Sequence, residues 1–269
     1  MKAPAAILAA LLLCGAAQAQ AQAQTKTRAA PICTDRPAKA NSVCTVPPAT
    51  FQLETNALGW SRTETSASRS ETVTVAASVA KIGLTDRSDL QVGFTPFAQL
   101  TSRAAGGSDR VAGVGDVLVR YKHRLTREDA PVQVALIPSV KLPTAAGGLG
   151  NDRLEASIAV PIGFALARSA TMTLGPELNL LADADGDGRH LSLVNLVNLS
   201  APLAPGWSIV GELWTNFNFD PAGTLEQVSA DAALVHAVSH DLQVDIGTNI
   251  GLTADTPDVE LYAGLSFRF

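Results

Sequence analysis

The chain has 269 residues, a formal net charge of −5, 46% hydrophobic residues and 5% aromatic residues. This mild acidity, without a long run of basic residues, argues against a nucleic-acid partner. After the amino terminus, no stretch reaches the roughly 18 uncharged apolar residues that a membrane-spanning helix requires. If the mature chain enters a membrane, it must therefore do so as a closed β-barrel, in which all backbone groups are paired.

The amino terminus has the pattern of a secretory signal. Lys2 provides a basic start, an apolar run extends from Ile7 to Cys14, and a small-x-small sequence ends at Ala19. We therefore predict a signal peptide over residues 1–19 that is removed during export. The alternating Ala and Gln residues that follow leave a slightly later cleavage site open.

The segment before the first strand, residues 20–50, is rich in Ala and Gln and then in Pro, and it has no periodicity. Such a composition predicts a disordered periplasmic arm. Cys33 and Cys44 lie in this segment, and in an oxidising compartment we expect them to form a disulfide with each other.

From Phe51 to Phe269, apolar and polar residues alternate in segments of about ten residues, the length of a tilted membrane-spanning strand. Apolar side chains are expected to face lipid, and polar side chains the lumen. We predict an all-β fold, an antiparallel up-and-down barrel over residues 51–269. The twelve expected strands lie near residues 51–60, 71–84, 90–100, 117–125, 132–142, 153–166, 170–182, 190–200, 207–219, 227–234, 242–252 and 258–269.

The connections between these segments alternate between short and generally longer. Thr85 to Ser88 is a short one, whereas Ser61 to Ser70, Ser102 to Ala112 and Asp183 to Arg189 are longer. A membrane barrel with tight periplasmic turns and larger outer loops has this alternation, and a Greek-key sandwich would not need it. An even number of strands also leaves both termini in the periplasm.

The last segment alternates almost strictly and stops on Phe269. It resembles the closing strand of outer-membrane barrels, in which a terminal Phe is part of the signal that the barrel-assembly machinery reads. This resemblance implies that the protein lies in the outer membrane of a Gram-negative bacterium. Aromatic residues also fall near other strand ends, as membrane-interface girdles require: Phe51, Trp60, Trp207, Phe217 and Phe219.

Three internal segments, residues 113–122, 137–143 and 242–247, and the closing residues 263–269 resemble a family of outer-membrane transporters. That family is labelled "putative MetA-pathway of phenol degradation". The resemblance covers about residues 51–269 and implies a channel-like barrel, linked by name to uptake of aromatic or other small hydrophobic compounds. The Lys-Leu-Pro-Thr segment is usually followed at once by Gly, whereas Ala145 and Ala146 intervene here. The shape of this outer loop therefore stays open.

Strand phase turns a set of charged residues toward the lumen. Basic residues come first along the chain, and carboxylates dominate later: Arg120, Lys122, Arg124 and Lys141, then Glu177, Glu212, Asp231 and Asp245. The fourth and tenth strands of a twelve-stranded ring lie opposite each other. A basic and an acidic wall are therefore expected to face one another across a narrow pore and to select solutes by charge. The alternative is that these charges pair with each other and fill the lumen.

The outer loop Asp183-Ala-Asp-Gly-Asp-Gly188 resembles the start of a calcium loop, with oxygen ligands at alternate positions. The twelfth position is Val194, where such a loop requires a Glu. A solvated acidic turn is the expectation, and a bound divalent ion is the alternative.

The function expected from these features is a monomeric outer-membrane channel for passive uptake of small solutes, without a cofactor. Its other partners would be membrane lipids, lipopolysaccharide and, during insertion, the barrel-assembly machinery. A structural or adhesive barrel without a pore is one alternative. An outer-membrane lipid hydrolase is another, but His236 has the outward phase and Ser229 the inward phase, so no Ser/His pair is predicted and the protein is not expected to be an enzyme.

Overall fold

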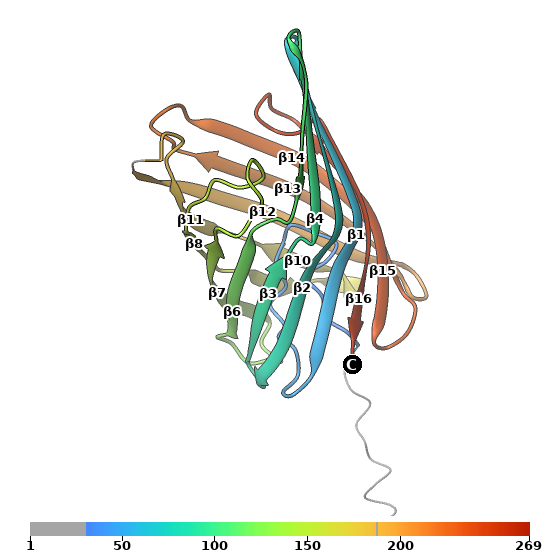
Figure 1. Ribbon diagram of the computed structural model, residues 1–269. Helices are drawn as coiled ribbons and strands as arrows, with labels where there is room; N and C mark the ends of the chain where they lie inside the picture. The colour runs from blue at the N-terminus through green and yellow to red at the C-terminus, as the bar shows by residue number, and fades with distance from the viewer. Residues whose placement is uncertain (1–30, 187) are drawn as a thin grey trace, which may run out of the picture. The chain divides into compact units, whose positions relative to one another are not determined.

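The computed structural model describes residues 31–186 and 188–269, so the predicted signal peptide and residues 20–30 lie outside the described residues. Residues 32–269 form one compact unit, built on a single antiparallel sheet (Figure 1). Its elements are β1 (Phe51–Glu64), β2 (Ser68–Thr85), β3 (Ser88–Phe94), β4 (Phe97–Ala104), β5 (Gly107–Gly113), β6 (Val117–Arg124), β7 (Val132–Leu142), β8 (Glu155–Ala159), β9 (Ile162–Ala165), the short 3-10 helix η1 (Ala167–Ser169), β10 (Thr171–Leu174), β11 (Glu177–Ala182), β12 (Arg189–Ala204), β13 (Trp207–Asn218), β14 (Leu225–Ala237), β15 (Leu242–Gly251) and β16 (Val259–Arg268). Within these residues there is no helix of the length and apolarity needed to cross a membrane.

The sheet closes on itself, because β1 pairs with both β2 and β16. Four of its sixteen segments continue another segment. β3 and β4 both pair with β2 and together form one interrupted strand. β6 pairs with β3 and β5 pairs with β4, so β5 and β6 form the next one. In the same way β8 and β9 are halves of one strand, and β10 and β11 are halves of another. Twelve strands remain, each antiparallel to its neighbours. The predicted twelve-stranded up-and-down barrel is confirmed.

Prolines lie at three of the four strand interruptions. Pro96 separates β3 from β4, Pro161 separates β8 from β9, and Pro176 separates β10 from β11. Proline has no N–H group to donate to the neighbouring strand, so the regular pairing stops there. The last two interruptions are adjacent in space, and the Val160 N–H donates to the Pro176 carbonyl at 2.9 Å.

The exterior of the barrel is apolar and its interior polar, the reverse of a soluble protein. On β15, Ile246 is 60% exposed while the neighbouring Asp245 is 6% exposed. The last strand has the predicted phase, with Phe267 exposed and Ser266 fully buried. Because lipid contacts the outside and water the inside, this distribution is that of a membrane-spanning barrel.

The two chain ends of the sheet meet at one end of the barrel. Phe51 and Phe269 exchange two backbone hydrogen bonds of 3.2 and 3.0 Å, which join the first strand to the last residue. Tight turns such as Asp86–Arg87 lie at the same end, so this is the periplasmic end. Trp207 also lies there, and Trp60 lies toward the outer end.

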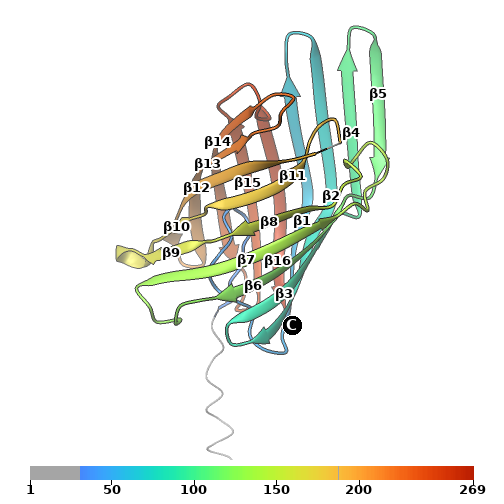
Figure 2. The same ribbon diagram turned by 90° about the vertical axis from the view of Figure 1, so that its left-hand side faces the viewer.

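Two predicted outer loops are largely strand. β1 continues to Glu64 and β2 begins at Ser68, while β4 and β5 form a hairpin that turns at residues 105–106. The two hairpins lie side by side through the β2–β4 pairing and extend beyond the other outer loops (Figure 2). Sequence periodicity missed them because charged residues replace apolar ones on their outward face.

The barrel begins at Phe51 as predicted, but the structure corrects the prediction of a disordered arm over the part of residues 20–50 that it describes. Residues 32–50 are not a free arm but enter the lumen, where they follow the inner wall of the barrel (Figures 1 and 2). We call residues 32–50 the plug. A disulfide joins Cys33 to Cys44 within it. The plug has few apolar residues to bury, and its order comes instead from charged partners on distant strands, which local composition cannot reveal.

Candidate functional site

A plug carboxylate neutralises the basic wall of the lumen. The two Asp35 oxygens lie 2.6 Å from Lys81 Nζ and 2.7 Å from Lys122 Nζ, and Arg120 Nη2 lies 3.8 Å away. Both lysine side chains are almost completely buried. The Ser42 N–H and hydroxyl also donate to Asp35, at 2.7 Å each. One plug residue thus holds three wall cations.

Plug cations form ion pairs with two carboxylates of the acidic wall, and plug N–H groups donate hydrogen bonds to a third. The Arg36 guanidinium donates two hydrogen bonds to Asp245, of 2.6 and 3.2 Å, and Lys39 Nζ lies 3.2 Å from Asp231. The backbone N–H groups of Lys39 and Ala40 donate to the two Glu212 oxygens at 3.1 and 3.0 Å.

Wall residues with little bulk or with aromatic faces accommodate these two plug cations. Gly264 leaves the space that the Arg36 guanidinium occupies, since a Cβ there would overlap with it. The Lys39 ammonium lies over the Trp214 ring, 4.4 Å from its centre, where a cation–π attraction supplements its ion pair.

The predicted basic and acidic walls therefore meet the plug rather than each other. The plug presents Asp35 to one wall and Arg36 and Lys39 to the other. Removing one partner of a buried ion pair typically costs about 3–5 kcal/mol, because it leaves an uncompensated charge. The plug is accordingly held by several contacts that are each costly to break.

Sequence analysis missed the plug residues and two wall residues, Glu54 and Lys81. Glu54 accepts hydrogen bonds from the Asp35 and Arg36 N–H groups, at 3.0 and 3.1 Å, and forms an ion pair with Lys81. Both wall residues have the inward phase of their strands. Their signal was present but weak, because these two strands alternate less regularly than the later ones.

Three other predicted residues lie away from the plug anchors. The Arg124 guanidinium donates to the Asp86 carbonyl at 2.9 Å and so holds a periplasmic turn. Lys141 lies near the outer mouth, where its Nζ is 2.8 Å from a Glu155 oxygen. Glu177 lines two cavities on the outer side of the plug.

Cavities lie on both sides of the plug. A cavity of about 420 Å³ opens among periplasmic strand ends, and cavities of about 350 and 280 Å³ lie on the outer side. Asn41 lines all three, and its Oδ1 accepts a hydrogen bond from Arg120 Nη1 at 2.9 Å. Asn41 of the plug therefore lies between the outer cavities and the periplasmic one.

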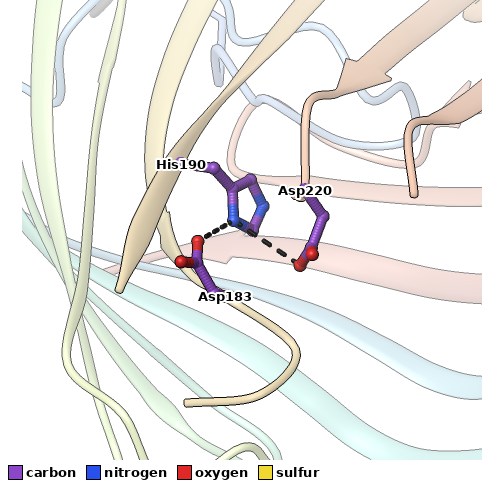
Figure 3. Close-up of side chains that lie close together, drawn as sticks. All are labelled: Asp183, His190 and Asp220. Atoms are coloured by element: carbon purple, nitrogen blue, oxygen red, sulfur yellow. Dashed lines mark hydrogen bonds and ion pairs between the residues drawn. The ribbon is translucent and has the colours of Figure 1, made fainter. Parts of the chain in front are cut away.

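A second polar group lies at the outer end, where two neighbouring loops meet (Figure 3). His190 Nδ1 is 2.8 Å from an Asp183 oxygen and 3.6 Å from an Asp220 oxygen. The Ala222 and Ala184 N–H groups donate to Asp220 and, with the nearby imidazole, hold the pKa of its carboxyl below the ordinary value even though partial desolvation opposes them.

One nitrogen and two carboxylate oxygens within 4.8 Å form a ligand set that divalent transition metals accept. Asp183 belongs to the predicted acidic loop and turns toward His190, whereas Asp187 lies outside the described residues. The spacing of these residues in the sequence does not identify them as one group. The group forms only when the β13–β14 loop brings Asp220 to them.

The residues of the hydrolase alternative do not come together. His236 stacks on Trp207, with ring centres 4.2 Å apart, on the outward face near the periplasmic end. Ser229 is buried in the lumen, where its hydroxyl accepts a hydrogen bond from Lys39 Nζ at 2.7 Å.

Comparison with known proteins places the chain in a family. The family model described as "Putative MetA-pathway of phenol degradation" matches residues 34–269. Among solved structures, the COG4313 outer membrane channel from Pseudomonas putida F1 has the same fold, with a TM-score of 0.69 and 15% identity over 87% of this chain and 100% of that chain. The CymD monoaromatic hydrocarbon channel aligns with a TM-score of 0.47 and 8% identity over 83% of this chain and 88% of that one. No curated protein sequence matches significantly.

The closed barrel, with its lipid-facing apolar exterior and polar lumen, places the protein in the outer membrane of a Gram-negative bacterium. The family match begins inside the plug, at residue 34, and ends on the closing Phe269. The chain therefore belongs to the family described as "Putative MetA-pathway of phenol degradation", as an outer-membrane barrel of twelve strands with the plug in its lumen.

Proposed function

We propose that this protein is a channel for passive uptake of small solutes, and that its solutes are aromatic or other small hydrophobic compounds. The observation that carries the proposal is the pair of lumen cavities on either side of Asn41, of about 420 and 350 Å³. A purely structural barrel has no need for such space. The family description, which refers to phenol degradation, supports the aromatic class.

The outer cavity suits a ring with a polar substituent. Its volume of about 350 Å³ falls in the usual range for small-molecule sites, about 300–1,000 Å³. Leu118, Ile137 and Leu181 provide apolar lining, and Lys141 and Glu177 provide polar groups. A phenol-like molecule could place its ring against the first group and its hydroxyl near the second.

The predicted lumen residues then divide into two roles. Arg120, Lys141 and Glu177 line the solute path, while Lys122, Glu212, Asp231 and Asp245 hold the plug that sets its width. Arg124 supports a periplasmic turn. This division assigns selectivity to the few charged groups around Asn41.

Three further features belong to this proposal. The pore lies within one closed chain, so a monomer suffices. Phe269 is part of the signal that the barrel-assembly machinery reads, and lipopolysaccharide surrounds the outer part of the barrel. The proposed transport is diffusion down a gradient and uses no cofactor or enzymatic step.

The test is electrical recording in planar bilayers combined with phenol uptake into proteoliposomes. We expect a small single-channel conductance and faster phenol equilibration than in empty liposomes. Absence of both would overturn the channel and favour the structural barrel. Hydrolysis of phospholipid by the purified protein, lost in a Ser229→Ala variant, would favour the hydrolase instead.

A further inference from the structure

The outward face of the two long hairpins changes from apolar to charged within one step of the strand register. Cross-strand neighbours form rows around the barrel wall, and the row of Leu58, Val75 and Phe97 consists of exposed apolar side chains. The next outward row toward the outer end is mostly apolar and contains Leu261, Trp60, Val73 and Gln99. Beyond it, charged side chains predominate on the same face, beside Val259, Thr101 and Ser108.

Two charged rows follow. The first contains Arg62, Glu71 and Arg110, and Thr101 is the cross-strand neighbour of both Glu71 and Arg110. The second contains Glu64, Arg69 and Arg103. We call these six residues the arginine face. Four arginines against two glutamates give it a charge of +2, in a chain whose formal net charge is −5.

The arginines of this face are incompletely satisfied. Arg69 and Arg103 are direct cross-strand partners, an arrangement in which like charges repel. Glu71 serves both, at 2.7 and 3.1 Å. Within the described part of the chain, Arg110 has no ion-pair partner, and the shielded Nε atoms of Arg62 and Arg69 have no hydrogen-bond acceptor. The Arg62 Nε lies 3.9 Å from a Glu64 oxygen, too far for a hydrogen bond, so within the described residues Arg110 is the arginine of this face that lacks an anion.

The position of the face indicates which anion is available. Successive rows on one face of a strand lie about 7 Å apart, so the charged rows begin within about 7 Å of the last apolar row. Trp60 in that apolar row is a residue type that marks the membrane interface. The arginines therefore lie at the level of the lipid head groups of the outer leaflet.

We propose that Arg62, Arg69, Arg103 and Arg110 bind the phosphates of lipid A, the phosphorylated glycolipid anchor of lipopolysaccharide. Guanidinium groups bind phosphate oxygens through paired, charge-assisted hydrogen bonds. The acyl chains of the same molecule lie over the row of Leu58, Val75 and Phe97. The inference names the site for the lipopolysaccharide contact proposed above, but it rests only on the outer-membrane location and not on channel activity.

The experiment measures binding of lipid A to the purified full-length barrel in detergent, by native mass spectrometry and by titration. The paired variant Arg69→Gln/Arg103→Gln is compared with Arg127→Gln, which alters an exposed arginine in a periplasmic turn. We expect the paired variant to bind lipid A at least about tenfold more weakly, the equivalent of about 1.4 kcal/mol, and the control variant to bind normally.

Three competitors separate lipid A from other anions. Lipid A without phosphates and phosphatidylglycerol should each bind more weakly, and millimolar inorganic phosphate should not displace lipid A. Equal binding of either lipid, displacement by inorganic phosphate, or normal binding by the paired variant would each overturn the proposal.

A second variant, Arg110→Gln, guards against misfolding, because Arg110 makes no ion pair whose loss could destabilise the hairpin. It should weaken lipid A binding severalfold while the band shift between heated and unheated protein on gels stays normal. Unchanged affinity in this variant counts against the site. Bilayer conductance should stay normal in all variants, so failure of this proposal and failure of the channel are distinguishable.

Discussion

Asp35 and Lys122, 87 residues apart in the chain, meet in the lumen with 2.7 Å between carboxylate oxygen and ammonium nitrogen. The contact ties a segment that precedes the first strand to the middle of the barrel wall. Lys81, on another strand, approaches the same carboxylate at 2.6 Å. Because both lysines are buried, neither has water as a substitute partner, and the plug is part of the electrostatic balance of the pore.

The first prediction concerns the variant Asp35→Asn. It leaves two buried lysines without this counter-charge, a loss on the order of 3–5 kcal/mol for a buried pair. We expect the plug to leave the lumen for a larger fraction of the time and single-channel conductance to rise severalfold. Asp129→Asn, at an exposed ion pair with Arg127, is the matched control and should conduct normally. Normal conductance in Asp35→Asn would mean that other contacts suffice to hold the plug.

Arg120→Glu tests the part of the proposed path where the wall meets the plug. The native guanidinium donates to Asn41 and lies 3.8 Å from Asp35, so a carboxylate at this position would repel the plug and attract cations. Reversal potentials in a salt gradient should shift toward cation selectivity. Arg127→Glu makes the same charge change outside the lumen and should leave selectivity unaltered. Unchanged selectivity with normal conductance would remove Arg120 from the constriction.

The disulfide variant Cys33→Ser/Cys44→Ser tests how the plug keeps its shape. The loop between the two cysteines contains the anchors Asp35, Arg36 and Lys39. A disulfide that closes a loop lowers the entropy of the detached segment and so favours the ordered plug. For a loop of 15 residues this stabilisation is about 3 kcal/mol.

We expect the serine variant to show frequent brief openings in bilayer recordings. A reducing agent should reproduce them in the native protein and add nothing in the variant. Indistinguishable recordings before and after reduction would assign plug order to the wall contacts alone.

Phe269→Ser tests the closing residue. Its backbone bonds to Phe51 would survive, but the exposed ring beside Phe267 would be lost. We expect severalfold less folded protein in the outer membrane of cells, whereas detergent refolding of purified protein should change little. Phe219→Ser, which removes another exposed ring at the opposite end, should assemble normally. Equal yields of the two variants would deny Phe269 a special role in assembly.

The barrel could be predicted because its pattern is local. The alternation of Leu261, Phe267 and Phe269 with Ser266 and Arg268 depends only on positions two apart, and it sets which side chains meet lipid. The same rule placed Lys122, Glu212, Asp231 and Asp245 inside the barrel. Strand number and direction followed from the spacing of such segments.

The partners of those inward charges could not be predicted, since strand closure brings together residues far apart in the chain. The Asp35 contacts, the Arg36–Asp245 pair 209 residues apart, and the meeting of Asp220 with His190 all depend on the register of several strands at once. A segment of low hydrophobicity looks disordered when read alone. Here the buried charges of the wall, which are unstable without partners, order it.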